Sequence, residues 1–371
     1  YDSIGNIIGH SFFGTDGKPC MHKDGYSVYK YRYDKKGNCI EGAFFDTIGR
    51  PCLSARQIAR WTAEYNSRGK RIREAYFDVH GKPTPLDNYA VMEIEYDGLG
   101  NELERRYLGL DGKPVPSTEG VHRLSRRYDN AGNEISWEIS DARGNPTLAN
   151  LGFAKRTMLY DGRRNMVSLK YTGIDGRPVL LKGRFSGLTR KYDARDRMIE
   201  EAYTGADDAP CMTDQGYAIL RQQFSDRGFV TEQSFFDTAG APCLNTNGFF
   251  KTAQKHDALG NILSTEYFGV DGKPCLSVQG IASFTSRYNE RGKRIEMACF
   301  GTNGQPALLP EGYARWTVKY NERGNPVEQL FYGVDGKPCN AREGYAKRIW
   351  KYDEHGKQQA IVHYDSNGKQ L

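Results

Sequence analysis

The sequence predicts an all-β protein in which tandem β-hairpins of 32 residues form one long coiled antiparallel sheet, as a spiral, a superhelix or a closed barrel. Three observations predict this fold. Glycine makes up about 11% of the chain, against a usual share near 7%. The 24 tyrosines and 17 phenylalanines favour strands over helices. A Tyr-Asp pair, or a close variant, returns every 32 residues, apart from one interval of 31.

The repeat divides the chain into eleven full units and a partial twelfth. Because every residue belongs to it, we expect a single array over residues 1–371 with no second domain. The short interval loses its residue between Pro83 and Tyr89, which marks a loop. We also expect a fragment of a longer protein, because the first unit shows no capping change. The units begin at Tyr1, Tyr33, Tyr65, Tyr96, Tyr128, Tyr160, Tyr192, Phe224, His256, Tyr288 and Tyr320, and the partial unit at Tyr352.

Each unit contains two segments that alternate with the period of a strand. The first covers residues such as 70–77 or 101–108, with an aliphatic side chain on the inward face and an aromatic one four residues later. In the second, residues 312–320, Ala314, Trp316 and Val318 point one way and the intervening residues the other. Two strands per unit give about 23 strands, and an open sheet rarely exceeds about ten before it curls. The sheet is therefore expected to coil.

Two turns separate the strands. Tyr-Asp-x-x-Gly-Asn is typical of a tight hairpin connection, in which Asp accepts from the backbone and Gly adopts a positive φ. Arg164 and Asp196 replace this glycine in two units. The second turn, Asp-Gly-Lys-Pro, carries a proline in all eleven full units, and proline suits a strand start or edge.

Six of the eight cysteines directly follow this proline. Equivalent residues of successive units lie two strands apart, about 9.5 Å, which exceeds the Cα separation of roughly 7 Å that a disulfide tolerates. Other units carry Thr, Val or Ala there, so the place selects for a small residue. We therefore expect free, buried thiols that act as small apolar groups, and neither a metal site nor a cofactor site. Free thiols favour the cytoplasm.

Charged side chains form two rows on the outward face. Glu41, Glu104 and their equivalents form an acidic row, and basic residues of the second strand lie beside it. One interpretation is cross-strand ion pairing on a solvated face. The other is a track for an acidic partner, and on it we predict binding residues in the basic row and in the divergent unit 160–191. These candidates are Arg60, Arg123, Lys155, Arg163, Arg164, Arg184, Lys251, Arg315 and Lys347.

No catalytic residue is predicted. The seven histidines fall at unrelated places in the repeat, and the common nucleophile, zinc and phosphate-binding motifs are missing. An enzyme site in the divergent unit 160–191 is the weaker alternative, because its changes are basic and apolar. Trp61, Trp316 and Trp350 suit either core packing or a glycan platform. A net charge of +6 argues against nucleic acid, and no apolar run is long enough for a membrane-spanning helix.

The Tyr-Asp-x-x-Gly-Asn motif resembles that of YD-repeat proteins of the Rhs and teneurin kind. The matching residues are Tyr1–Asn6, Tyr33–Asn38 and Tyr128–Asn133, about six of every 32 residues. The resemblance implies hairpins wound into a spiral shell, often in bacterial toxins or at cell surfaces, and hence a secreted or surface location. The Gly-Lys-Pro-Cys block and the longer unit depart from that motif.

We expect a non-catalytic scaffold that binds a protein or peptide, as the recognition part of a larger bacterial-type protein. The alternative is part of a YD-type shell or surface adhesin, associated with toxin delivery or with glycan binding.

Overall fold

The computed structural model describes residues 1–371 as two compact units, Tyr1–Leu181 and Lys182–Leu371. The sequence repeat continues across the boundary, and a single array through both units stays a prediction. Each unit consists of strands and turns, with one 3-10 helix, η1 (Ala149–Leu151), in the first.

The first unit contains eleven strands. They are β1 (Gly9–Ser11), β2 (Val28–Tyr33), β3 (Cys39–Phe45), β4 (Arg60–Tyr65), β5 (Arg71–Phe77), β6 (Val91–Tyr96), β7 (Glu102–Leu108), β8 (Arg123–Tyr128), β9 (Glu134–Ser140), β10 (Lys155–Tyr160) and β11 (Met166–Thr172).

The second unit contains twelve strands. They are β12 (Gly187–Tyr192), β13 (Met198–Thr204), β14 (Ile219–Phe224), β15 (Val230–Phe236), β16 (Lys251–His256), β17 (Ile262–Phe268), β18 (Ser283–Tyr288), β19 (Arg294–Phe300), β20 (Arg315–Tyr320), β21 (Pro326–Tyr332), β22 (Lys347–Tyr352) and β23 (Gln358–Tyr364).

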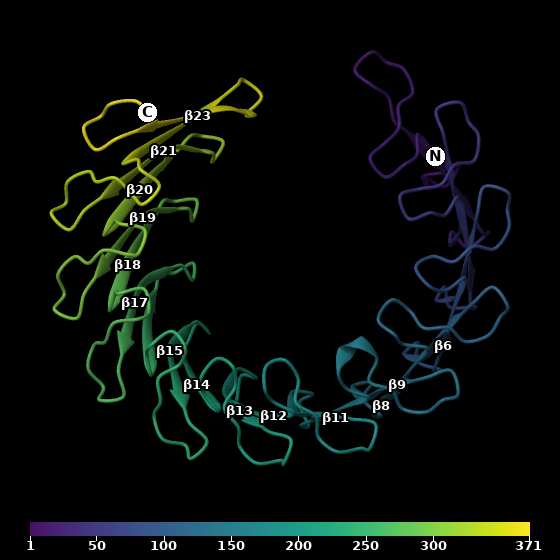
Figure 1. The fold of residues 1–371 in the computed structure, drawn as a ribbon, viewed down its shortest axis with the longest axis horizontal. Coiled ribbons are helices and arrows are strands. Elements are labelled where there is room, and N and C mark those ends of the chain that lie inside the picture. The colour runs from purple at the N-terminus through teal and green to yellow at the C-terminus, as the bar shows by residue number, and fades with distance from the viewer. The chain divides into compact units, whose positions relative to one another are not determined.

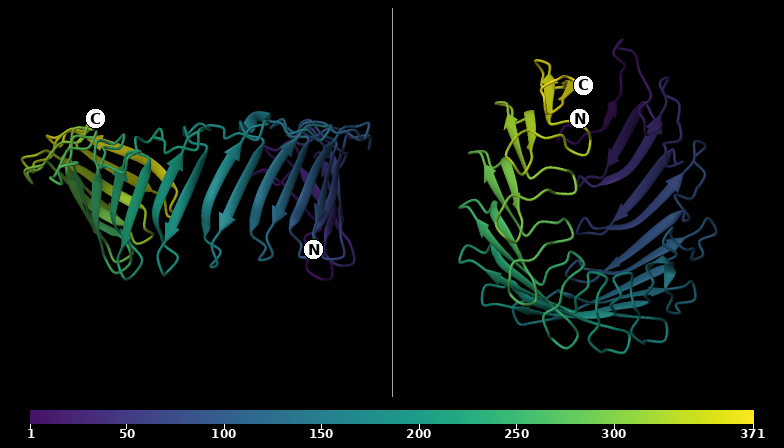
Figure 2. Two further views of the ribbon diagram at one scale, coloured as in Figure 1. Left: turned by 90° about the horizontal axis from the view of Figure 1, so that it is seen from below. Right: turned by 60° about the vertical axis from the view of Figure 1, so that its left-hand side comes forward.

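Within each unit every strand pairs antiparallel with the next strand of the chain (Figure 1). The first and last strands of a unit do not pair with each other, so neither sheet closes into a barrel. Successive strands run in opposite directions, so the short Tyr-Asp turns gather along one edge and the long connections along the other (Figure 2). The all-β hairpin-repeat fold is confirmed. The expected second strand starts later, at Arg315 rather than Gly312.

Each hairpin contains a β-bulge directly after the Tyr-Asp turn. In the hairpin of β4 and β5, Tyr65 pairs with Arg71, but its neighbour Glu64 pairs with Arg73, which leaves Ile72 as the extra residue. The bulge interrupts the simple alternation expected from the sequence. Arg71 consequently lies on the same face as Trp61, with its guanidinium 5.6 Å from the indole ring centre.

The long connection contains two more turns of the same hydrogen-bonding pattern as the Tyr-Asp turn. In the first repeat the N–H of Gly17 donates to the oxygen of Gly14, and the N–H of Gly25 donates to that of His22. The three turn glycines of a repeat all have positive φ, between 72° and 92° along the chain. At the shortened repeat, Leu86 and Tyr89 instead pair directly around a two-residue turn, as expected for a lost loop residue.

The aspartate of the proline turn stands at one of two positions in the repeats, and a steric conflict explains why both are not used together. Some repeats start it with Asp, such as Asp46, whose carboxylate accepts from the N–H groups of Ile48 and Arg50. Others start with Gly and carry Asp two residues later, as Gly269 and Asp271 do. A Cβ at Gly269 would lie 3.1 Å from Asp271 Oδ1, closer than two such atoms normally approach. The turn therefore holds its carboxylate at one position or the other.

The long connections fold back over one face of the sheet, which we call the core face. Residues that end the third turn, such as Ile58, Val121 and Ile281, are buried there against strand side chains. The connections also contact each other, since Cys52 Sγ lies 3.6 Å from the oxygen of Gly25 in the preceding repeat. They cover only part of the face, so aliphatic residues near the Tyr-Asp turns, such as Leu103 and Leu263, stay 37% and 38% exposed.

Candidate binding site on the charged face

The opposite face of the sheet, the charged face, carries a ladder of ion pairs. Glu41 of β3 lies directly opposite Arg32 in its own hairpin and diagonal to Arg60 of the next hairpin. Its carboxylate accepts from both guanidinium groups, at 3.2 and 3.0 Å. Glu328 is held in the same way between Lys319 and Lys347, at 2.7 Å each. The alternation predicted from the sequence thus places acids between two basic neighbours.

All six predicted residues of the basic row are committed to these pairs. We use "basic row" for Arg60, Arg123, Lys155, Lys251, Arg315 and Lys347. Each pairs with a glutamate of the preceding hairpin, namely Glu41, Glu104, Glu138, Glu232, Glu296 and Glu328 respectively. Exposed pairs of this kind contribute about 0–1 kcal/mol each. The pairing interpretation is therefore correct for the geometry, and a binding role of the row stays a prediction.

Most of the basic row also lies over an aromatic ring. The last residue of the following strand, directly opposite in the hairpin register, is usually Phe or Tyr, and we call these residues the ring row. Arg60 lies 4.0 Å from the ring centre of Phe77, and Arg315 lies 4.0 Å from that of Tyr332. Lys251 and Lys347 lie 5.0 and 5.8 Å from their rings. The ring row comprises Phe45, Phe77, Phe236, Phe268, Phe300, Tyr332 and Tyr364, and Phe13, beyond the end of β1, stands at the equivalent place of the first repeat.

The ring row is interrupted at Leu108, Ser140 and Thr172 in the first unit and at Thr204 in the second. Ser140 is the register partner of Arg123, and Thr172 is the register partner of Lys155. A hollow of about 520 Å³ lies at these two residues, over β7 to β11. Its volume falls within the roughly 300–1,000 Å³ range of ligand pockets. A smaller hollow of about 340 Å³ lies at Lys347 and Tyr364 in the second unit, where the ring is present, so the gap at Ser140 and Thr172 is the larger of the two.

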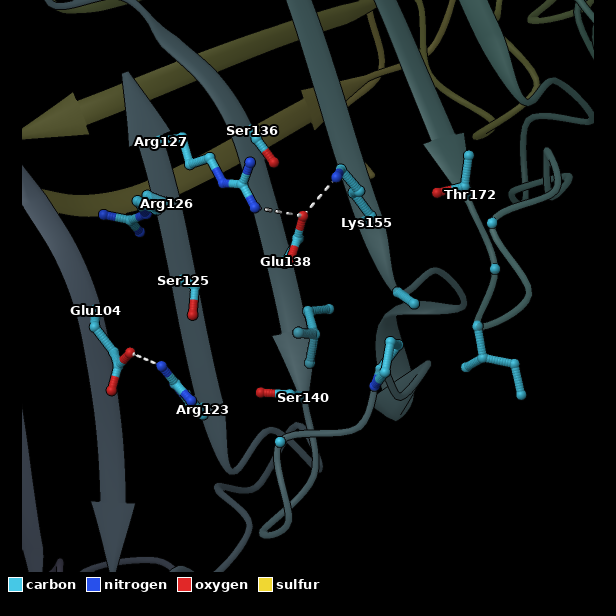
Figure 3. A pocket seen from close by; sticks show the side chains of 17 residues that line it. Glu104, Arg123, Ser125, Arg126, Arg127, Ser136, Glu138, Ser140, Lys155 and Thr172 are labelled. Carbon is cyan, nitrogen blue, oxygen red and sulfur yellow. Dashed lines mark ion pairs between the residues drawn. The ribbon is translucent and has the colours of Figure 1, made fainter. Parts of the chain in front are cut away.

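The hollow combines cations, carboxylates and hydroxyl groups (Figure 3). Glu138 is held between Lys155, at 2.5 Å, and Arg127, at 4.0 Å. The hydrogen bond from the Lys155 ammonium holds the pKa of the Glu138 carboxyl below its usual value. Arg123 pairs with Glu104, so the lining holds four cationic residues, Arg123, Arg126, Arg127 and Lys155, and two carboxylates; Arg126 pairs with Glu102 and Glu134 outside the hollow. Hydroxyls line it at Ser125, Ser136, Ser140 and Thr172.

The three remaining predicted residues lie in turns. Arg163 and Arg164 belong to the Tyr-Asp turn before β11, and the N–H of Arg163 donates to Asp161. Arg164 stands in the glycine place with φ of 68°. Arg184 belongs to the second unit, in the third turn before β12, with φ of 65°. Of the nine predicted residues, the structure therefore brings Arg123 and Lys155 together at the hollow. The other seven lie outside its lining.

Sequence reasoning missed the residues that make the hollow. It considered the charged residues of the basic row but not the aromatic residues of the ring row. The ring-row position of the twelve repeats is Phe or Tyr in eight and Leu108, Ser140, Thr172 and Thr204 in the other four; of these four, Ser140 and Thr172 face a basic residue. That pair of small residues is the available signal.

The cysteine thiols and two of the predicted tryptophans take part in the packing of the fold. All eight cysteines are free. Cys299 is buried, but the six that follow the proline are only half-buried, not buried as predicted. Burial raises the pKa of the Cys52, Cys243 and Cys339 thiols and raises that of Cys299 to about 11. Trp61 and Trp316 pack against core clusters. None of the helices in the structure has the length and apolar character required to span a bilayer.

Comparisons with known proteins find fold likenesses of low identity. No protein-family model and no curated protein sequence matches the chain. Among solved structures it is similar to TcdB2-TccC3-TEV, with 14% identity, a TM-score of 0.34, and coverage of 94% of this chain and 18% of that one. It is also similar to the Photorhabdus luminescens Tc holotoxin pore carrying TccC3-D651A, with 13% identity, a TM-score of 0.25, and coverage of 91% and 20%.

A porin-like protein from Bacteroides uniformis matches with 9% identity and a TM-score of 0.16, over 90% of this chain and 87% of that one. The chain spans about a fifth of the length of the Tc toxin chains. These likenesses are ones of fold, and the closer resemblance to YD-repeat proteins stays a prediction.

Proposed function

We propose that this chain is a non-catalytic repeat scaffold that binds a segment of a protein partner at the hollow over β7 to β11. The observation that supports the proposal is the interruption of the ring row at Ser140 and Thr172, where a polar hollow lies beside Arg123 and Lys155; the ring is also missing at Leu108 and Thr204, but those residues face Val91 and Gly187. The cations Arg123 and Lys155 and the surrounding hydroxyls supply hydrogen-bonding groups for a peptide backbone.

Selection from a displayed random-peptide library tests this proposal on the chain as it stands. We expect enriched peptides that bind the chain and that lose about tenfold or more in affinity when Lys155→Ala removes one cation of the hollow. The matched control is Lys319→Ala, which removes an equally paired lysine, 2.7 Å from Glu328, in the second unit. Failure to enrich any peptide, or equal loss in both variants, contradicts the proposal.

A second candidate is a section of a YD-type shell or surface adhesin associated with toxin delivery. It takes its support from the Tyr-Asp-x-x-Gly-Asn motif, and the fold likeness to Tc toxin structures agrees with it. Electron microscopy of this chain together with its native flanking sequences tests the candidate. An enclosed particle is expected, and an open array of hairpins contradicts it.

A further inference from the structure

The repeats provide an internal comparison for the hollow, because equivalent positions are filled in some units and vacant in others. Four of the six basic-row residues lie over a ring of their own hairpin, at 4.0 to 5.8 Å. Arg123 and Lys155 instead face Ser140 and Thr172 in the same register. These two cations keep their glutamate partners and lack the ring beneath them. At these two adjacent hairpins, the charged face therefore has the cation of a cation–π pair but not the aromatic ring.

From this comparison we propose that the hollow takes up Phe or Tyr side chains of a bound peptide, each ring occupying the place that a repeat's own ring fills elsewhere. The inference rests on the proposed function and names the chemistry of the partner. An aromatic ring gains both apolar burial and attraction to a cation held at its face. The volume of about 520 Å³ accommodates such side chains together with part of their backbone.

The composition of the hollow favours an aromatic peptide over other ligands. Glu104 and Glu138 stand beside the two cations, and their carboxylates oppose a phosphate group. A neutral ring meets no such opposition, and it leaves both ion pairs intact. Pro146 and Ile174 add apolar lining beside Ser140 and Thr172. The hydroxyls of Ser125 and Thr172 are suited to hydrogen bonds with peptide groups.

Two small probes test the inference on the native chain. N-acetyl-tyrosine amide and N-acetyl-leucine amide carry the same peptide groups and differ in the ring. We expect the tyrosine amide to shift the NMR amide signals of Ser140 and Thr172 and to bind about tenfold more tightly than the leucine amide. Equal affinity of the two probes, or shifts confined to residues away from the hollow, overturns the inference.

Two sets of variants exchange the filled and vacant states between repeats. Ser140→Phe with Thr172→Phe restores the ring row, so the variant is expected to stay folded and to lose the tyrosine-amide shifts. Phe268→Ser opens the equivalent place under Lys251 in the second unit and is expected to create a new site there. Retained binding after both places are filled contradicts the inference. If the filled variant does not fold, the probe comparison on the native chain still decides it.

The outcomes for the two proposals differ. If no library peptide binds but the tyrosine amide does, the proposed function fails and the aromatic site stands. If library peptides bind at the hollow without any requirement for Phe or Tyr, the aromatic site fails and the proposed function stands.

Discussion

The hydroxyl of Tyr65 donates a hydrogen bond of 2.8 Å to the main-chain oxygen of Cys39. The paired residues of β3 and β4 run from Glu41 to Ala43 on one side, so this bond joins the two strands beyond their ladder. It explains why tyrosine rather than any aromatic residue marks the repeat. The same bond recurs at Tyr33, Tyr128, Tyr288, Tyr320 and Tyr352, at 2.9 to 3.1 Å.

Tyr65→Phe removes this hydroxyl and leaves the ring in place. Because a half-buried carbonyl loses its partner, we expect a decrease of about 1 kcal/mol in the free energy of unfolding. Urea denaturation followed by circular dichroism measures it. Tyr1→Phe is the control, since Tyr1 is 81% exposed and no such bond involves its hydroxyl. Equal stability of Tyr65→Phe and the native chain contradicts the role assigned to the hydroxyl.

The Tyr-Asp turns make stability depend on acid pH. The Asp34 carboxylate accepts hydrogen bonds from the side chain of Asn38 and from backbone N–H groups, and these bonds lower its pKa. Asn133 lowers the pKa of Asp129 in the same way. A lowered pKa in the folded state stabilises the protein above the unfolded value, about 3.9 for Asp, and this contribution is lost as the pH falls through the folded value. We expect the melting temperature to fall between about pH 4 and pH 2.

Replacing Asp34 and Asp129 with asparagine, which does not titrate, provides the control for this pH dependence. Asn66 already fills the place in one repeat and accepts from the N–H groups of Arg68 and Lys70, so the turn tolerates an amide. The double variant Asp34→Asn, Asp129→Asn should show a shallower decrease of melting temperature with acid. An unchanged slope would show that other groups dominate the acid transition.

Arg164 occupies a glycine place with φ of 68°, in the left-handed region. Such a conformation costs an ordinary residue about 1–2 kcal/mol, partly offset by the flexibility of glycine in the unfolded chain. We therefore expect Arg164→Gly to raise the free energy of unfolding by roughly 0.5–1 kcal/mol. Gly132→Arg makes the reverse change in the preceding repeat, where nothing lies within 4 Å of the added Cβ, and should lower it similarly. Changes of the same sign in both variants contradict this account.

The cysteines should react slowly with alkylating agents. The thiolate is the reactive form, and burial raises the pKa of most of these thiols, that of Cys299 to about 11. We expect Cys299, which is 1% exposed, to be modified last by iodoacetamide at pH 7.5, as followed by mass spectrometry. Modification of Cys299 at the rate of a free cysteine in the denatured chain would contradict its burial.

The sequence alone determined the repeat, the hairpin and two of its three turns; the third turn, at His22–Gly25 in the first repeat, was missed. Its period of 32, the invariant proline and the alternation around Trp316 follow from local geometry, because each strand and turn is specified by residues close together in the chain. The loop at the shortened repeat was predictable for the same reason, since a lost residue is tolerated only where no strand register depends on it.

Only the tertiary structure decided which residues of the charged face contact one another. The bulge that carries Arg71 to the core face, and the register that sets Arg123 over Ser140 and Lys155 over Thr172, arise from pairing between strands. Charge along one strand cannot show that a cation is already paired with the preceding hairpin, nor that the ring beneath it is missing. These relations join residues of different strands, so they become visible only when the strands lie side by side.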